Sequence, residues 1–175
     1  MTPIICPQCG STNTSPSTLP LLYCRDCQIE FGGDHQELVA ETRLIVLNTY
    51  QQGAASQNLT FSKTAAGATI EGPFLCYYPD LPEIYISQLQ WQQLLEGFFK
   101  LHVTDWKSEY QSDTPDDFGW DLKIICENQE PLISRGWGCY PPYWAALMDL
   151  FTSLGLPNIG NKLGQNFLQL QTQSH

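Results

Sequence analysis

The stretch CPQCGSTNTSPSTLPLLYCRDC, residues 6–27, decides the fold of the amino-terminal part of the chain. It contains two Cys-x-x-Cys hooks, Cys6-Pro7-Gln8-Cys9 and Cys24-Arg25-Asp26-Cys27, with residues 10–23 between them. Zn²⁺ prefers four ligands in a tetrahedron, and soft thiolates suit it. Each hook offers two thiolates, and the chain between the hooks forms a loop that brings them together. The spacing predicts one metal ion bound by Cys6, Cys9, Cys24 and Cys27.

Four sulfur ligands fill the coordination shell of a tetrahedral ion and leave no position for water. We therefore expect a structural ion rather than a catalytic one. Zn²⁺ is the expected metal, and iron is the chemical alternative because a four-cysteine site suits both metals. Residues 1–33 offer few large apolar side chains, so metal binding is expected to supply much of the folding free energy of this segment.

The strings Cys6-Pro7-Gln8-Cys9-Gly10-Ser11 and Tyr23-Cys24-Arg25-Asp26-Cys27, with Phe31 four residues beyond, resemble the zinc-ribbon family. The resemblance covers about 30 residues and implies two metal-binding knuckles on a β-hairpin. Zinc ribbons occur in transcription factors, ribosomal proteins, some transposases and many enzymes. Some of them bind nucleic acid, whereas others only brace a fold. Arg25 is the one lysine or arginine among residues 1–33, which disfavours nucleic-acid binding here.

Residues 34–67 are predicted to be a connecting helix and a linker. Asp34 can cap a helix with Glu37 as its capping-box partner, which favours a helix over residues 35–50. Residues 42–50 are rich in β-branched side chains, so a strand is the alternative there. Residues 51–67 are rich in Gln, Ala, Ser and Gly, which is typical of a linker, with a short strand at 59–63 as an option.

Residues 68–164 are predicted to form an α+β domain with an antiparallel sheet and two main helices. Ser87 and Gln90 form a capping-box pattern, and apolar residues then repeat at helical spacing. Strict alternation over residues 118–126 predicts a half-buried strand that a hairpin connects to the next strand. The predicted elements are strands at 73–78, 118–126 and 131–135 and helices at 88–102 and 142–154, followed by a frayed tail at 165–175. The chain as a whole is therefore expected to be an α+β protein that begins with a zinc ribbon.

Composition limits the classes of partner. Eighteen acidic residues against eight basic ones give a net charge of −10, which opposes binding to phosphate backbones or anionic membranes. The sequence contains no long apolar run and no signal-peptide pattern, so we expect a cytoplasmic protein with no membrane partner. Cys76, Cys126 and Cys139 are expected to be buried thiols, as free cysteines commonly are.

An aromatic loop follows the predicted hairpin. Large aromatic side chains around glycines often form a contact surface or a shallow pocket. We therefore predict a partner-binding surface made by Arg135, Trp137, Tyr140 and Tyr143. Recognised catalytic motifs are missing from the sequence, and His102 is expected to be a half-buried helix residue.

These patterns favour a non-enzymatic, acidic, zinc-containing accessory protein that binds another protein. Two alternatives remain open at this stage. The first is nucleic-acid binding through the ribbon. The second is an enzyme whose site lies near Cys139, with Arg135 as the nearby cation that a reactive thiol would need.

Overall fold

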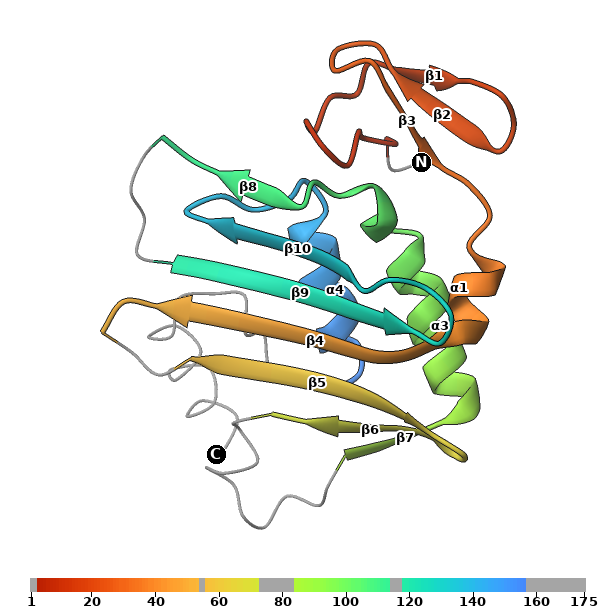
Figure 1. Ribbon diagram of the computed structural model, residues 1–175, viewed down its shortest axis with the longest axis vertical. Coiled ribbons are helices and arrows are strands. Elements are labelled where there is room, and N and C mark those ends of the chain that lie inside the picture. Colours follow the sequence, from red (N-terminus) through yellow and green to blue (C-terminus); the bar gives the residue numbers. More distant parts are fainter. Residues whose placement is uncertain (1–2, 54–55, 73–83, 114–117, 157–175) are drawn as a thin grey trace.

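The strands form two sheets in the computed structural model, which describes residues 3–53, 56–72, 84–113 and 118–156 (Figure 1). The first sheet is the ribbon, an antiparallel arrangement in the order β1-β2-β3. Its strands are β1 (Thr14–Pro16), β2 (Leu21–Cys24) and β3 (Ile29–Gly32). β2 and β3 form the hairpin that the zinc-ribbon resemblance implies, and β1 adds a strand from the Ser- and Thr-rich loop.

The second sheet has seven strands in the order β7-β6-β5-β4-β9-β10-β8. They are β4 (Thr42–Gln51), β5 (Gln57–Thr64), β6 (Gly67–Glu71), β7 (Ile84–Ser87), β8 (Glu109–Gln111), β9 (Phe118–Cys126) and β10 (Leu132–Trp137). The predicted α+β class is confirmed. The sheet is not wholly antiparallel, because β8 pairs parallel with β10. β10 lies between β8 and β9 in the sheet and pairs antiparallel with β9.

Two predictions for residues 34–67 are wrong. The helix expected over 35–50 is only α1 (Gln36–Glu41), and residues 42–51 form β4, the alternative that β-branched residues favoured. Residues 57–64 form β5, an interior strand paired on both sides, and not a linker; the short strand considered at 59–63 lies within it. Leu59 and Phe61 are fully buried two residues apart, so their apolar side chains outweigh the linker-like composition around them.

Helix α3 (Gln88–Phe99) begins with the predicted capping box. The Gln90 amide donates to Ser87 Oγ at 3.2 Å, and the Ser87 amide donates to Gln90 Oε1 at 2.9 Å. The helix was predicted to run to residue 102, but it ends at Phe99. The chain then adopts a left-handed conformation at His102, with φ of 54°, which a helix cannot continue through. The 3₁₀ helix η1 (Val103–Asp105) follows.

Helix α4 (Trp144–Thr152) is shorter than the predicted 142–154. Its start is delayed because the Trp144 amide donates to the Pro141 carbonyl in a tight turn, at 3.0 Å. α3 and α4 lie on one side of the seven-stranded sheet (Figure 1). The predicted strand at 73–78 and the predicted tail at 165–175 lie outside the described residues.

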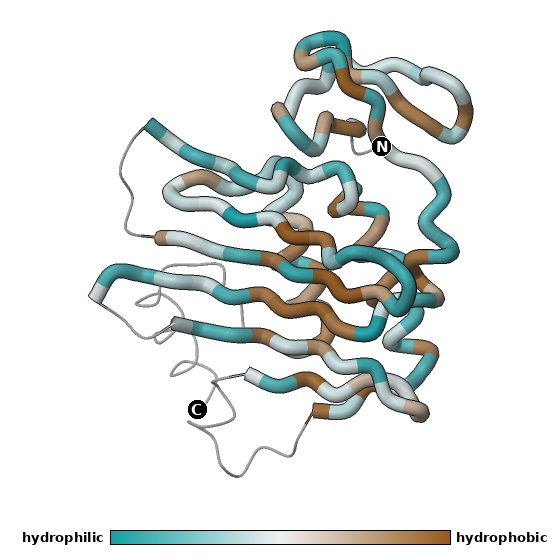
Figure 2. Tube along the Cα trace, in the orientation of Figure 1, coloured by the Kyte–Doolittle hydropathy of each residue, from teal (hydrophilic) through white to brown (hydrophobic). Residues whose placement is uncertain are grey.

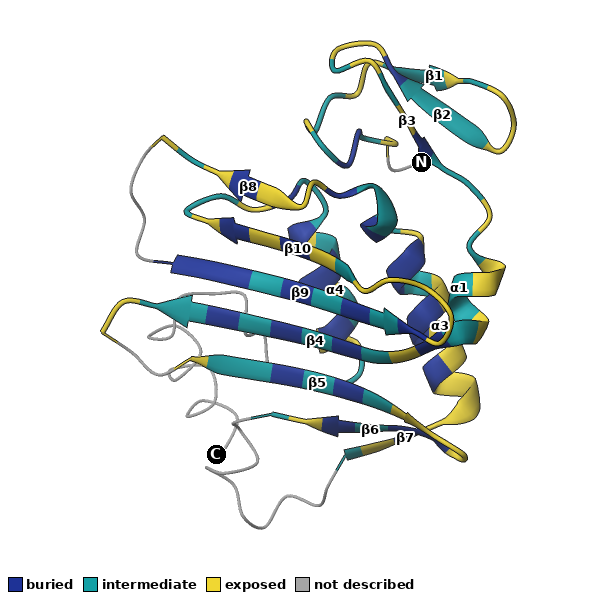
Figure 3. Ribbon diagram, viewed as in Figure 1, coloured by how far each residue is buried: buried dark blue, intermediate teal, exposed yellow. Residues whose placement is uncertain are grey.

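The core lies between this face of the sheet and the helices. Figure 2 shows apolar residues along the middle strands, and Figure 3 shows that buried positions alternate along them. The ring centroids of Phe61 and Phe151 are 5.0 Å apart, and those of Trp120 and Trp144 are 5.1 Å apart. The sheet and helices therefore form one continuous apolar core.

The other face of the sheet carries polar side chains. Asn58, Asn48, Asp121 and Arg135 are successive cross-strand partners on β5, β4, β9 and β10. Asn48 Nδ2 donates to Asp121 Oδ2 at 2.7 Å. Along these strands, apolar side chains that face the helices alternate with polar side chains on the other face, as in an antiparallel sheet that packs on one face only.

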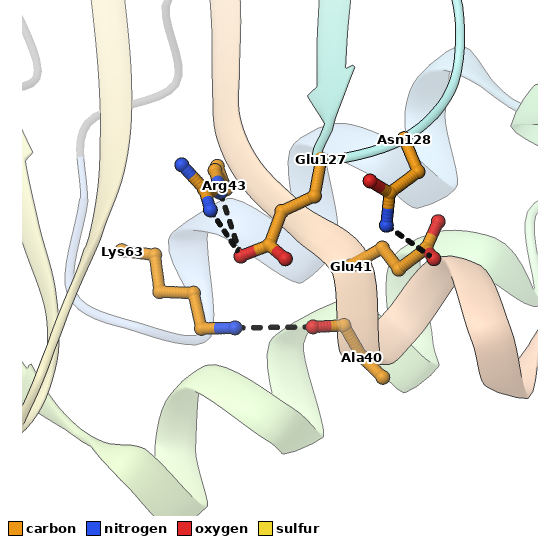
Figure 4. Close-up of polar contacts among 6 residues, drawn as sticks. All are labelled: Ala40, Glu41, Arg43, Lys63, Glu127 and Asn128. Carbon is orange, nitrogen blue, oxygen red and sulfur yellow. Dashed lines mark hydrogen bonds and ion pairs between the residues drawn. The ribbon is translucent and has the colours of Figure 1, made fainter.

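Polar contacts also hold the junction of α1 and β4 against neighbouring strands (Figure 4). Arg43 Nη2 lies 2.6 Å from Glu127 Oε1, and Lys63 Nζ donates to the Ala40 carbonyl at 3.0 Å. These groups are exposed, so each contact contributes no more than about 1 kcal/mol.

Candidate metal centre

Each hook is closed by a tight turn of the backbone. The Gly10 amide donates to the Cys6 carbonyl, and the Gln28 amide donates to the Cys24 carbonyl, both at 2.9 Å. Gly10 and Gln28 are both left-handed, with φ of 74° and 60°. A glycine adopts this conformation without strain, whereas Gln28 does so at some cost. The two hooks therefore have the same backbone shape although only one of them is followed by glycine.

The turns bring the four hook sulfurs together, as the spacing predicted. Cys6 Sγ lies 3.5 Å from Cys27 Sγ, and Cys9 Sγ lies 3.6 Å from Cys24 Sγ. Sulfurs on one tetrahedral Zn²⁺ are about 3.8 Å apart, because Zn–S bonds are about 2.3 Å. All four sulfurs lie within 4.8 Å of one another, and the cysteines are free thiols. The cluster has the size and the ligand chemistry to hold one metal ion.

Protonation of the metal-free cluster is uneven. The Cys27 backbone amide donates to Cys24 Sγ and lowers the pKa of that thiol to about 7. Burial is the main cause that raises the pKa of the Cys27 thiol to about 12. Ligand sulfurs must be thiolates, so binding of an ion releases protons from the cluster.

The ribbon has only a small core of its own. Cys6, Cys24 and Phe31 are buried, whereas Cys9 is exposed. So few buried side chains cannot offset the loss of chain entropy in a segment of this length. An ion held by the sulfur cluster would therefore be one source of order within the ribbon, and contacts with the rest of the chain are another.

Two tyrosines of the α+β domain fasten the first hook. Tyr143 Oη donates to the Ile5 carbonyl at 2.8 Å, and Tyr110 Oη donates to the Pro7 carbonyl at 2.9 Å. Burial raises the pKa of Tyr110 to about 12, so its hydroxyl keeps its proton at neutral pH. Gln8 Nε2 adds a third bond, to the Asp105 carbonyl at 3.1 Å.

The end of the ribbon is also fastened. Asp105 Oδ2 accepts a hydrogen bond from the Gly32 amide at 3.0 Å, and the rings of Phe31 and His102 meet edge to face with centroids 5.3 Å apart. Burial lowers the pKa of His102, although the nearby Asp105 carboxylate opposes this shift. The contacts join residues about 70 to 140 positions apart, so no local pattern in the sequence announces them.

The structure separates the four residues predicted to bind a partner. Arg135 and Trp137 project from the same face of β10, and Trp137 is 49% exposed. Tyr140 is 37% exposed and packs against Trp144, with ring centroids 5.2 Å apart. Tyr143 instead bonds to the ribbon, as described above. Cys139, the candidate nucleophile, has its sulfur 3.9 Å from the Tyr140 carbonyl.

A groove of about 670 Å³ runs beside Arg135 and Trp137. Trp137, which lines the groove, packs against Gly119, where an added Cβ would lie 2.2 Å from Trp137 Cε3. Asp121 in the groove accepts hydrogen bonds from Tyr50 Oη and Asn48. Burial and the Asp121 carboxylate raise the pKa of Tyr50 to about 12. The sequence alone does not single out Tyr50 or Asp121, although their alternation with buried neighbours places both on the polar face.

The helices within the described parts of the chain are too short or too polar to cross a membrane. Comparison with known protein families, with curated proteins and with solved structures finds no match to this chain. The zinc-ribbon resemblance of residues 4–31 is thus supported by the four clustered cysteines, and no family is established.

Proposed function

We propose that this chain is a non-enzymatic accessory protein, in which a structural Zn²⁺ orders the ribbon and the groove beside Trp137 binds another protein. The observation that carries the proposal is the pairing of a closed four-sulfur cluster with an exposed tryptophan next to a groove. A closed sulfur shell supports a structural ion, because a catalytic zinc ion needs an open position for water.

Zn²⁺ is the metal that we propose for the sulfur cluster. Elemental analysis of the purified chain distinguishes zinc from iron. Cobalt substitution reports the ligands, because a thiolate bound to Co²⁺ gives a charge-transfer absorption. We expect the same absorption in the parent chain and in Cys139→Ser, and a weaker band with lower cobalt affinity in Cys24→Ser, because that variant keeps only three thiolates. An unchanged band intensity and an unchanged cobalt affinity in Cys24→Ser contradict the assignment of the four ligands.

The groove supports recognition of a basic peptide segment. The chain carries a net charge of −10, and Glu109 and Asp121 line the groove. The exposed indole of Trp137 is the best aromatic partner for a lysine or arginine cation, and it also offers apolar area. Arg135 lies 4.0 Å from Glu109, so its charge is partly balanced within the protein.

A peptide array tests this assignment. Labelled full-length protein is applied to peptides that place Lys or Arg beside an apolar residue, with matched acidic peptides as the negative set. We expect Trp137→Ala to weaken binding at least about tenfold, in the range of an aromatic hot spot. Ile133→Ala is the matched control, because Ile133 is a 54% exposed residue of the same strand. Equal loss in both variants, or no binding to any basic peptide, rejects the groove as the binding site.

A reducing compartment such as the cytoplasm is the proposed location. Cys126 and Cys139 are free thiols, as are the four hook cysteines, and thiols persist in reducing compartments. A gel-shift assay with nucleic acid tests the alternative function. A shift at low salt that weakens with added salt would favour nucleic-acid binding over the protein-binding proposal.

A further inference from the structure

A second group of metal-ligating side chains lies where the ribbon joins the α+β domain. His35 follows the end of β3, His102 follows α3, and Asp105 ends η1. One ligand atom from each of the three residues lies within 4.8 Å of those from the other two. Sequence analysis treated His102 as a helix residue and gave no role to His35 or Asp105, which are brought together only by the fold.

Two of these side chains lack the hydrogen bonds that buried polar atoms normally make. Among the described residues, His35 Nε2 and His102 Nδ1 are buried side-chain atoms without a hydrogen-bond partner. Burying an imidazole nitrogen without a partner costs free energy, so each such atom in a folded protein calls for an explanation. A cation bound between these two nitrogen atoms and the neighbouring Asp105 carboxylate would explain both of them.

Asp105 is already held in place for such a role. The Gly32 amide and Thr104 Oγ1 both donate to Asp105 Oδ2, at 3.0 and 3.4 Å. The rings around the two histidines hold them in the same way: His102 packs edge to face on Phe31, and His35 lies 5.8 Å from Phe99 between ring centroids. Ligands held by neighbouring groups lose less freedom when an ion binds.

We propose that His35, His102 and Asp105 form a second metal site, for a divalent first-row ion of the Zn²⁺ type. Imidazole nitrogen suits these ions, and two histidines with one carboxylate are a common ligand set for them. Ligand atoms on one tetrahedral Zn²⁺ lie about 3.4 Å apart, and rotation about side-chain bonds can close the difference from the observed span.

Three protein ligands leave one position of a tetrahedral ion for water or for a small anionic ligand, in contrast to the closed sulfur cluster. His35 also lines a groove of about 820 Å³ between α1 and α3, whose walls include Trp91, Phe99 and Lys100. The groove brings solvent to the side of the cluster formed by His35. The second ion therefore differs from the first in both its ligands and its access to solvent.

Metal counting on the full chain tests the proposal. Native mass spectrometry at increasing Zn²⁺ is expected to show two ions on the parent chain. His35→Gln and Asp105→Asn are expected to bind one ion, with the affinity for the second reduced more than about tenfold, the lower end of what losing a supporting group costs. Asp105→Asn keeps an oxygen that can accept from Gly32. His175→Gln, which changes the third histidine of the chain, is the control and is expected to bind two ions.

Cobalt absorption separates this site from the sulfur cluster. Both variants are expected to keep the thiolate-to-cobalt band, which shows that the ribbon is folded and that only the nitrogen and oxygen site is lost. A single ion on the parent chain at saturating Zn²⁺ overturns the proposal. So does a second ion that persists in both His35→Gln and Asp105→Asn. Neither result affects the assignment of the sulfur cluster.

Discussion

Replacement of Tyr110 by phenylalanine tests how the ribbon is attached. Tyr110 is buried, its hydroxyl donates to the Pro7 carbonyl at 2.9 Å, and it accepts from the Lys107 amide at 3.1 Å. Phenylalanine keeps the ring and removes only the oxygen. Pro7 is itself buried, so its carbonyl is left without this bond, at a cost of about 1–3 kcal/mol. Lys107 is exposed, so water can replace the bond to its amide.

We therefore expect Tyr110→Phe to lower the free energy of unfolding by about 2 kcal/mol, most of it from the Pro7 carbonyl. For a chain of this size the same change lowers Tm by about 4–8 °C. The assay is urea denaturation with zinc in excess, together with hydrogen exchange of the ribbon amides, because the ribbon can detach before the main core unfolds.

Tyr85→Phe is the matched control, because Tyr85 is 66% exposed on the edge strand β7, and its change is expected to stay within about 0.5 kcal/mol. If Tyr110→Phe has no larger effect than this control and leaves ribbon exchange unchanged, the Tyr110 hydroxyl does not hold the ribbon.

Three further substitutions test the packing of the sheet and of α3. Gly67→Ala is expected to destabilise the fold by at least about 2 kcal/mol or to prevent folding, because its Cβ would lie 2.0 Å from the Ile86 carbonyl oxygen; urea denaturation measures the loss. Phe61→Ala is expected to cost about 3–5 kcal/mol, because the side chain is fully buried in the core; calorimetry measures the change. Ser87→Ala removes one half of the capping box with Gln90 and is expected to cost about 1 kcal/mol, measured by urea denaturation.

Gly53→Ala is a control for Gly67→Ala, because Gly53 also has positive φ, and among the described residues, its chain neighbours aside, no atom lies within 4 Å of its added Cβ. Equal losses in the two glycine variants would show that backbone conformation, and not the contact with β7, accounts for the effect. A loss below about 1 kcal/mol in Phe61→Ala would contradict its place in a close-packed core. A larger effect for Ser87→Ala than for Phe61→Ala would contradict the packing described here.

Local chemistry in the sequence predicts the parts of this fold that depend on near neighbours. The two hooks predict the sulfur cluster because the two cysteines of each hook are three residues apart, and the backbone turn between them brings their sulfurs to the same side. Ser87 and Gln90 predict the start of α3 for the same reason. The alternation over residues 118–126 predicts β9, since apolar residues at every second position suit a strand with one buried face.

The errors arise where tertiary packing outweighs local pattern. Asp34 and Glu37 suit a helix start, yet the helix stops at Glu41 because Ile45 and Leu47 are buried within the sheet. Polar residues around Leu59 suggested a linker, although that strand lies inside the sheet and is paired on both sides. Propensity is a weak guide when a strand is paired on both sides.

The candidate sites divide in the same way. The sulfur cluster could be predicted from spacing alone. The cluster of His35, His102 and Asp105 could not, because its members come from the ribbon connection and from a turn about 70 residues later. Of the four residues predicted to form a partner surface, Arg135 and Trp137 line this groove, and its role in binding stays a prediction. Tyr50 and Asp121 also line it, and they come from strands that only the sheet places beside Trp137.

The attachment of the ribbon also sets an order of events during protein synthesis. The ribbon leaves the ribosome before the residues that anchor it, and its four cysteines are all available once Cys27 has emerged. Its anchoring residues come much later, since Tyr110 lies 103 residues beyond Pro7, and Tyr143 lies 138 residues beyond Ile5. The newly made ribbon therefore stays tethered without these anchors until Tyr110 and Tyr143 have emerged. If the proposed ion binds in that interval, the ribbon is ordered before its anchoring residues are made.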